Sequence, residues 1–310
     1  MILIKMRSMN KLLLLVICFT ITTVLSAQKE VNVSQYMLSR YAVNTAFGGS
    51  HEALSILGSY RQKWMGFNGT PTSLFFAAHA PLKKDAVALG LEFYNQNYNV
   101  VNESGFAGSY TYRVRTGNNI WLGFSVSGGL SFTSVNWGGV PLKETGDPVF
   151  VNEEKKSVPI LGFGTAIYGE SFFAGVSVPN FYYNDITTSE KASIDPGKAQ
   201  FLFTGGYMFT LSEMFKVQPS ALAIINRKEG NIIDASGSVI WNDMLWIGLT
   251  YRTIEEIVGM AAFQVLPQLR VAYSFDYNTG QLKNYNNGTH EFSLQYKFGY
   301  KVNTPSPKFF

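Results

Sequence analysis

The chain has 310 residues, of which 46% are hydrophobic, 15% aromatic and only 15% charged, whereas soluble domains average about 25% charged residues. The single Cys excludes a disulfide framework and a Cys-rich metal centre. The formal net charge of +4 is too small to indicate a nucleic-acid-binding protein.

The first 27 residues have the pattern of a secretory signal peptide. Basic residues precede an apolar run from Leu12 to Leu25, and Ala27 supplies a small residue at the expected cleavage point. We therefore expect residues 1–27 to be removed during export. Residues 28–52 precede the first predicted strand, and we expect them to form an N-terminal arm in the periplasm or a plug.

Most of the remaining chain alternates apolar residues with small or polar ones. Leu245, Ile247, Leu249 and Tyr251, for example, are separated by single residues of the other kind. This period of two predicts β-strands. The predicted strands number fourteen and cover 53–64, 70–80, 86–96, 101–114, 119–133, 157–168, 171–179, 199–211, 214–226, 230–241, 244–254, 256–266, 268–278 and 288–300.

Such alternation fits a soluble β-sandwich or a membrane barrel. Segments of about 10 residues are long enough to cross a bilayer as tilted strands. Their apolar faces often end in aromatic residues, as at a membrane interface, and their other faces carry Gly, Ser and charges. We therefore predict an all-β fold, a transmembrane antiparallel β-barrel of about 14 strands over 53–300, with a short N-terminal plug or arm and a tail at 301–310.

The lengths of the connections predict the orientation of the barrel. Outer-membrane barrels alternate short periplasmic turns with longer extracellular loops. The three longest connections, 134–156, 180–198 and 279–287, all join an odd-numbered strand to an even-numbered one. We therefore expect both termini in the periplasm of a Gram-negative bacterium.

Charged side chains of both signs are predicted to face the lumen. They could pair with one another or line a wet channel. The set is Arg61, Lys63, His79, Glu92, Arg113, Asp234, Arg252, Arg270, Asp276, Glu291 and Lys297.

No catalytic or metal-binding constellation stands out. The three His residues have no metal-ligand spacing. His290 and Ser293 lie three positions apart, and an odd spacing on a strand places two side chains on opposite faces. We expect no catalytic residue, no metal, no cofactor and no enzymatic activity.

Several segments resemble the PorP/SprF family, the outer-membrane barrels of the type IX secretion system of Bacteroidota. Tyr60–Thr72 is similar to the family pattern Y-R-x-Q-W-x-G-F-x-G-x-P-x-T. In a second matching segment, Val43–Gly49, Thr45 stands where the family usually has Pro. The other matching segments are Ser34–Met37, His79–Leu82, Gly175–Asn180, Tyr273–Tyr277 and Gly288–Leu294.

The resemblance implies a role in protein secretion or gliding motility. Family members act with a periplasmic ring of PorK and PorN type, or pair with a large secreted adhesin that carries a type-B C-terminal domain. The expected surroundings are outer-membrane lipid, and no nucleic acid. A passive porin or small-molecule transporter is the alternative, and a lipid- or glycan-cleaving barrel enzyme is less favoured.

The family-like segments supply the candidate contacts for a plug or partner. Gly66 and Pro71 suit a tight turn that closes the first hairpin or serves as a docking surface, with Trp64 and Phe67 at its rim. The full set is Tyr36, Met37, Asn44, Phe47, Gly49, Arg61, Trp64, Gly66, Phe67, Pro71 and His79.

Overall fold

The structure is a computed structural model. It describes residues 34–66, 69–82, 85–117, 119–137, 153–183, 193–194, 199–227 and 230–299. The expected signal peptide at 1–27 and the tail at 301–310 lie outside the described residues, as does Phe67. No helix in the described ranges is long and apolar enough to cross a membrane.

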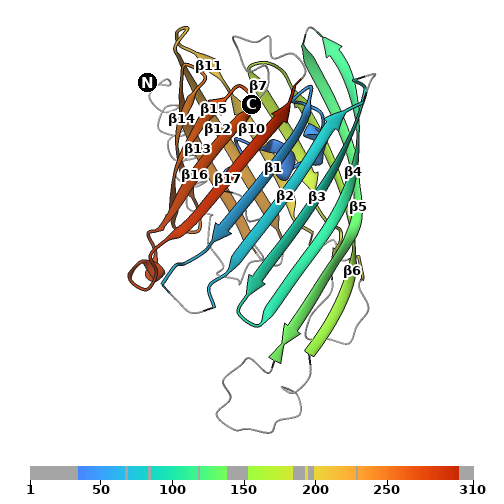
Figure 1. The fold of residues 1–310 in the computed structure, drawn as a ribbon, viewed down its shortest axis with the longest axis vertical. Coiled ribbons are helices and arrows are strands. Elements are labelled where there is room, and N and C mark those ends of the chain that lie inside the picture. Colours follow the sequence, from blue (N-terminus) through green and yellow to red (C-terminus); the bar gives the residue numbers. More distant parts are fainter. Residues whose placement is uncertain are drawn as a thin grey trace, which may run out of the picture.

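The described strands close into one antiparallel barrel (Figure 1). Neighbours in sequence pair with each other, and β1 closes the ring by pairing with β17. The strands of the wall are β1 (Leu54–Gln62), β2 (Thr72–Pro81), β3 (Val87–Tyr98), β4 (Val101–Gly117), β5 (Ile120–Asn136), β6 (Glu153–Tyr168), β7 (Phe172–Val178), β10 (Phe201–Tyr207), β12 (Phe215–Asn226), β13 (Gly230–Trp241), β14 (Leu245–Arg252), β15 (Glu256–Leu266), β16 (Leu269–Asn278) and β17 (Thr289–Phe298).

The predicted fold class is confirmed, with fourteen strands in the closed wall. Each of the fourteen predicted ranges overlaps one wall strand. The two-residue strand β11 (Phe209–Thr210) adds a short pairing to β12. A separate hairpin of β8 (Tyr182–Tyr183) and β9 (Ser193–Ile194) lies outside the wall sheet.

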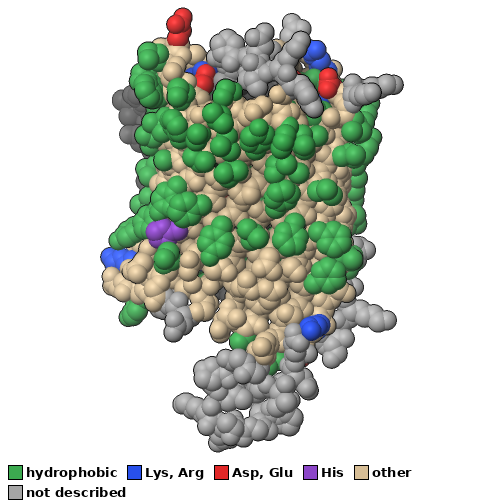
Figure 2. Space-filling model, viewed as in Figure 1, with side chains coloured by type: hydrophobic (Ala, Val, Ile, Leu, Met, Phe, Trp, Pro, Cys, Tyr) green, Lys and Arg blue, Asp and Glu red, His purple; other side chains and the backbone are tan. Residues whose placement is uncertain are grey.

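The outer face of the wall is apolar. On β14, Ile247 and Leu249 are 59% and 62% exposed, while Trp246, directly before Ile247, is only 1% exposed because it points inward. Figure 2 shows hydrophobic side chains spread over the visible face of the wall, with charged side chains near its two ends. A single closed sheet with this outer face excludes the soluble β-sandwich and provides a lipid-facing surface.

The two ends of the barrel differ. The long connections β5–β6, β7–β10 and β16–β17 meet at one end, which we call the loop end. At the other end, the terminal end, β1 begins and β17 finishes. Connections there are short: Asn242, Asp243 and Met244 join β13 to β14. Asn242 and Asp243 both have φ near +50°, a conformation typical of tight hairpin turns.

Residues 34–52 lie inside the barrel, and we call them the plug (Figure 1). Two 3₁₀ turns, η1 (Arg40–Ala42) and η2 (Thr45–Phe47), form its middle. Its side chains contact strands on opposite walls, since Tyr36 reaches β12 and β13 whereas Tyr41 reaches β4. The plug therefore spans the lumen, and polar groups from most of the wall hydrogen-bond to it.

Candidate functional site: the plugged lumen

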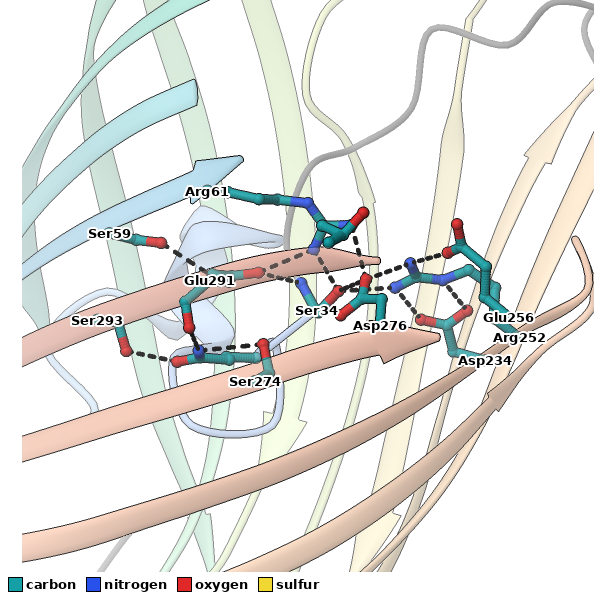
Figure 3. A network of polar contacts seen from close by, with 12 residues as sticks. Ser34, Ser59, Arg61, Asp234, Arg252, Glu256, Ser274, Asp276, Glu291 and Ser293 are labelled. Atoms are coloured by element: carbon teal, nitrogen blue, oxygen red, sulfur yellow. Dashed lines mark hydrogen bonds and ion pairs between the residues drawn. The ribbon is translucent and has the colours of Figure 1, made fainter. Parts of the chain in front are cut away.

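An ionic network occupies the lumen near the loop end (Figure 3). Arg61 on β1 pairs with Asp276 at 2.8 Å and with Glu291 at 2.9 Å. Arg252 on β14 pairs with Asp234 and Glu256, each at 2.9 Å, and with Asp276 at 3.3 Å. No side chain in these pairs is more than 4% exposed. The network joins β1 to β13, β14, β15, β16 and β17.

Ser34 at the start of the described plug sits in the centre of this network. Its backbone N–H donates to Glu291 Oε2 at 3.0 Å, and its hydroxyl donates to Asp276 Oδ2 at 2.7 Å. The same hydroxyl oxygen accepts from both Arg61 and Arg252. Because buried charges are costly unless hydrogen-bonded, Ser34 completes the network while the network holds the plug.

The next plug residues pack on the wall formed by β12, β13 and β14. Tyr36 is fully buried, and its hydroxyl lies 3.2 Å from Ser220 Oγ and 3.1 Å from Ser236 Oγ. Met37 accepts a hydrogen bond from Ser238 Oγ at 3.2 Å. Both residues belong to an apolar cluster that includes Trp246. This part of the lumen resembles a protein core rather than a channel.

Asn44 fixes the turn η2 against β6 and β7. Its Oδ1 accepts from Ala46 N at 2.9 Å, which caps the turn. Its Nδ2 donates to Thr165 O at 3.0 Å and Val176 O at 3.3 Å. Thr45 holds the first position of the turn, where Pro is well tolerated, and its hydroxyl lies 2.8 Å from Ser125 Oγ. Thr thus gains a wall contact that Pro could not make.

Aromatic rings fill the lumen beside η2. Phe47 is 1% exposed, and its ring centroid lies 5.6 Å from that of Tyr168 and 6.1 Å from that of Phe173. The guanidinium of Arg40 lies over Phe173, with Cζ 4.4 Å from the ring centroid. Such cation–π contacts favour a buried Arg without neutralising its charge.

Gly49 is held between two wall side chains. Its N–H donates to His79 Nδ1 at 3.0 Å, and its carbonyl accepts from Arg113 Nη1 at 2.7 Å. Its φ of +73° favours Gly, and a Cβ there would lie 2.7 Å from Ala88 Cβ. The ring of His79 contacts the tilted rings of His51, at 5.0 Å between centroids, and Tyr41, at 4.6 Å.

The turn that follows β1 hydrogen-bonds to the start of β17 at the loop end. Lys63 N donates to Pro71 O at 2.8 Å, and Trp64 N donates to Thr289 Oγ1 at 3.3 Å. Met65 N donates to Gly288 O at 2.9 Å. Gly66 has a φ of +111°, which accounts for a glycine there. This segment therefore shapes the turn between β1 and β2.

A family model described as the type IX secretion system membrane protein PorP/SprF matches residues 25–296. That range includes the plug and all but the last residues of the wall. The chain belongs to the PorP/SprF family. The expected family resemblance is confirmed, and the protein is an outer-membrane β-barrel of the type IX secretion system family.

Solved outer-membrane barrels are similar to this PorP/SprF chain at low identity. Omp33 of Acinetobacter baumannii has a TM-score of 0.46 and 9% identity, covering 80% of this chain and 98% of that one. The toluene transporter TbuX of Ralstonia pickettii has a TM-score of 0.43 and 7% identity, covering 80% and 88%. A mutant of the Rhodopseudomonas blastica porin has a TM-score of 0.35 and 10% identity, covering 79% and 99%. A search of curated proteins by sequence gives no match.

The structure divides the candidate residues of this PorP/SprF barrel into two groups. Trp64, Gly66 and Pro71 belong to the loop-end turn, and Phe67 lies outside the described residues. The other candidates meet in the lumen, where the plug contacts the wall. They are Tyr36, Met37, Asn44, Phe47, Gly49, Arg61 and His79.

Sequence reasoning missed part of the lumen. Arg40 and Tyr41 carried no signal because a 3₁₀ turn has too few residues to show a period. Glu256 was also missed, although the parity of β15 supplies the signal: it lies two residues before Val258, which is 1% exposed on the inward face.

Proposed function

We propose that this barrel is a non-enzymatic component of type IX protein secretion that binds a protein partner rather than conducting small molecules. Membership of the PorP/SprF family supports the secretion role. The observation that favours a binding role is the plug, which spans the lumen from the Arg61–Ser34 network to the Gly49–His79 contact. A passive pore would require the plug to leave the lumen.

The partner we favour is a large secreted adhesin with a type-B C-terminal domain, which the barrel would help to secrete or anchor at the cell surface for gliding motility. A PorK/PorN-like periplasmic ring is the alternative partner. In this proposal the loop end faces outward, and both termini lie in the periplasm. The long β5–β6 hairpin at the loop end offers the most extended surface for an outer partner.

Two observations on side chains support a non-enzymatic role. Ser293 donates to Gln35 Oε1 of the plug, whereas His290 Nδ1 lies 2.7 Å from Tyr273 Oη. The Ser and His therefore engage different partners and form no nucleophile–base pair. Within the described residues, no group of three or more His, Cys, Asp or Glu side chains is arranged to hold a metal ion.

The proposal is tested by comparing the surface and secreted proteomes of a deletion strain with those of its parent and a complemented strain. Loss of one adhesin indicates a dedicated partner barrel, and loss of all type IX cargo indicates a part of the core machinery. An unchanged profile in a strain that also lacks every paralogue contradicts the proposal. Steady conductance of the purified barrel in planar bilayers would then support the porin alternative.

A further inference from the structure

Cationic groups gather at the terminal end of the lumen, on both the wall and the plug. In the wall, Lys297 on β17 lies opposite Ser55, which in turn lies opposite His79 on β2. Arg270 on β16 lies opposite Gln295, two residues from Lys297. Side chains two residues apart on a strand share a face, so Arg270 and Lys297 are diagonal neighbours on the lumen side.

The plug brings two more such groups to this place. The ring of His51 contacts that of His79, with 5.0 Å between their centroids. Arg40 is 8% exposed and reaches the same end, where its guanidinium lies over Phe173 near the start of β7. We call Arg40, His51, Arg270 and Lys297 the cationic cluster. Arg40 and His51 belong to the plug, whereas Arg270 and Lys297 belong to β16 and β17.

The plug members of the cluster and Lys297 lack anionic partners among the described residues. The guanidinium of Arg40 carries five N–H donors, but it donates no hydrogen bond to any described residue. His51 Nδ1 is buried without a hydrogen-bond partner. Lys297 forms no ion pair with a described carboxylate. Arg270 donates to Gln264 Oε1 at 3.1 Å and lies 4.3 Å from the centroid of Trp246.

Burial and nearby positive charges disfavour the charged forms of Arg40 and His51. Burial is the main reason that the pKa of Arg40 is lowered to about 9, and the charge of Arg270 lowers it further. Burial also lowers the pKa of His51, followed by the charges of Lys297, His79, Arg40 and Arg270. At the loop end, unlike Arg40, each Arg of the network pairs with a carboxylate. A bound anion would supply the negative charge that Arg40 and His51 lack among the described residues.

We propose that the cationic cluster binds a phosphate-type oxyanion that bridges the plug to the wall. Arg, Lys and imidazole donors from separate elements at one end of the lumen suit an anion with several charged oxygens, and Arg and Lys are the usual ligands of phosphate. The bridge neutralises the repulsion between Arg40 on the plug and the cations of β16 and β17. The phosphate group is either free phosphate or a phospholipid headgroup, and both offer the same chemistry to the site.

The test uses the full mature barrel in a neutral, phosphate-free detergent. Inorganic phosphate is titrated against sodium chloride at equal ionic strength, and thermal unfolding and isothermal titration calorimetry are recorded. We expect a saturable rise in Tm with phosphate that chloride does not reproduce. Lys297→Gln, at a half-buried site, should weaken phosphate binding at least tenfold. His51→Asn is the second variant should the first fail to fold.

Lys283→Gln is the matched control, because it removes the same charge from an exposed position at the loop end. It should bind phosphate as the parent does. Nanodiscs of phosphatidylglycerol without added phosphate identify the source. A stabilisation there that Lys297→Gln abolishes assigns the site to a lipid headgroup, whereas a shift that needs added phosphate assigns it to free phosphate. Equal effects of phosphate and chloride, or equal binding by parent and Lys297→Gln, overturn the proposal.

Discussion

The ionic network at the loop end predicts how tightly the plug is held. Arg61→Gln removes the pairs with Asp276 and Glu291 and the contact with the Ser34 hydroxyl. Breaking a buried ion pair by removing one partner costs about 3–5 kcal/mol. Asp276 and Glu291 stay buried beneath the docked plug and regain water when it leaves, so the cost of their lost partner falls on the docked state. Arg252 still pairs with Asp276, so we take the lower value, about 3 kcal/mol, as the loss in the free energy of plug docking.

A loss of about 3 kcal/mol raises the population of undocked plug by roughly 100-fold, since 1.4 kcal/mol corresponds to a factor of ten. The rate at which a thiol in the plug reacts with a maleimide measures that population. The only Cys of the chain is Cys18, in the expected signal peptide, so Ser39→Cys supplies a single reporter at a position that is 5% exposed. We expect the reaction rate to rise by roughly 100-fold when Arg61→Gln is added.

The control is Lys216→Gln. Lys216 pairs with Asp243 at 2.6 Å, and both side chains belong to the wall and its turns rather than to the plug. The substitution removes one positive charge and one partly exposed ion pair, so the thiol should react at the parent rate. Equal rates in the Arg61→Gln and parent proteins would refute the view that the network holds the plug. So would an equal increase with Lys216→Gln.

Three further predictions concern the plug. Asn44→Ala removes the turn cap and two hydrogen bonds to strand carbonyls, and should lower the free energy of unfolding by about 2 kcal/mol in denaturant titrations. Gly49→Ala should lower Tm because its φ is +73° and the new Cβ would meet Ala88, whereas Gly58→Ala, with no atom within 4 Å of a Cβ, should not. The folded-state pKa of His51 is lowered by burial, so docking should be stable above the ordinary His pKa of about 6.5 and weaken as pH falls below it. The test labels Ser39→Cys at pH 7.5 and pH 5 and divides each rate by that of a free thiol at the same pH, because the thiolate is the reactive form. The normalised rate should be higher at pH 5, and His51→Asn should reduce the difference.

The wall could be predicted from sequence because its physics is local. A residue on a membrane strand faces lipid or lumen, so the period of two reports both the element and the face. The predicted strand limits were least accurate where strands extend beyond the lipid. β4, β5 and β6 extend to Gly117, to Asn136 and back to Glu153, beyond the predicted limits at 114, 133 and 157. The hydrogen-bond ladder continues there through polar residues, and the apolar signal does not.

The plug could be predicted only in part. Its family-like residues singled out Tyr36, Asn44 and Phe47, but nothing local determines where a segment with two 3₁₀ turns lies. Its position depends on contacts with strands more than a hundred residues away, such as Asn44 with Thr165 and Tyr36 with Ser220. The charges of the lumen were predicted to face inward, but their pairing depends on strand register and on Ser34, which belongs to no strand.

The direction of the plug determines which contacts must break first. Its Ser34 end lies in the ionic network at the loop end, while its other end continues into β1 at the terminal end. The covalent link to Leu54 keeps that second end in place, so the plug can clear the lumen only by withdrawing toward the terminal end. Withdrawal must break the bonds of Ser34 to Glu291 and Asp276 before the chain can slide.

A partner that acts from the loop end would therefore reach the network before any other part of the plug. The cationic cluster lies at the opposite end, where the plug is tethered, so an anion bound there would oppose withdrawal without blocking access to the network. The two ends of the lumen thus act on one segment by different chemistry. Carboxylates and guanidinium groups hold the Ser34 end, and the proposed anion would hold the tethered end.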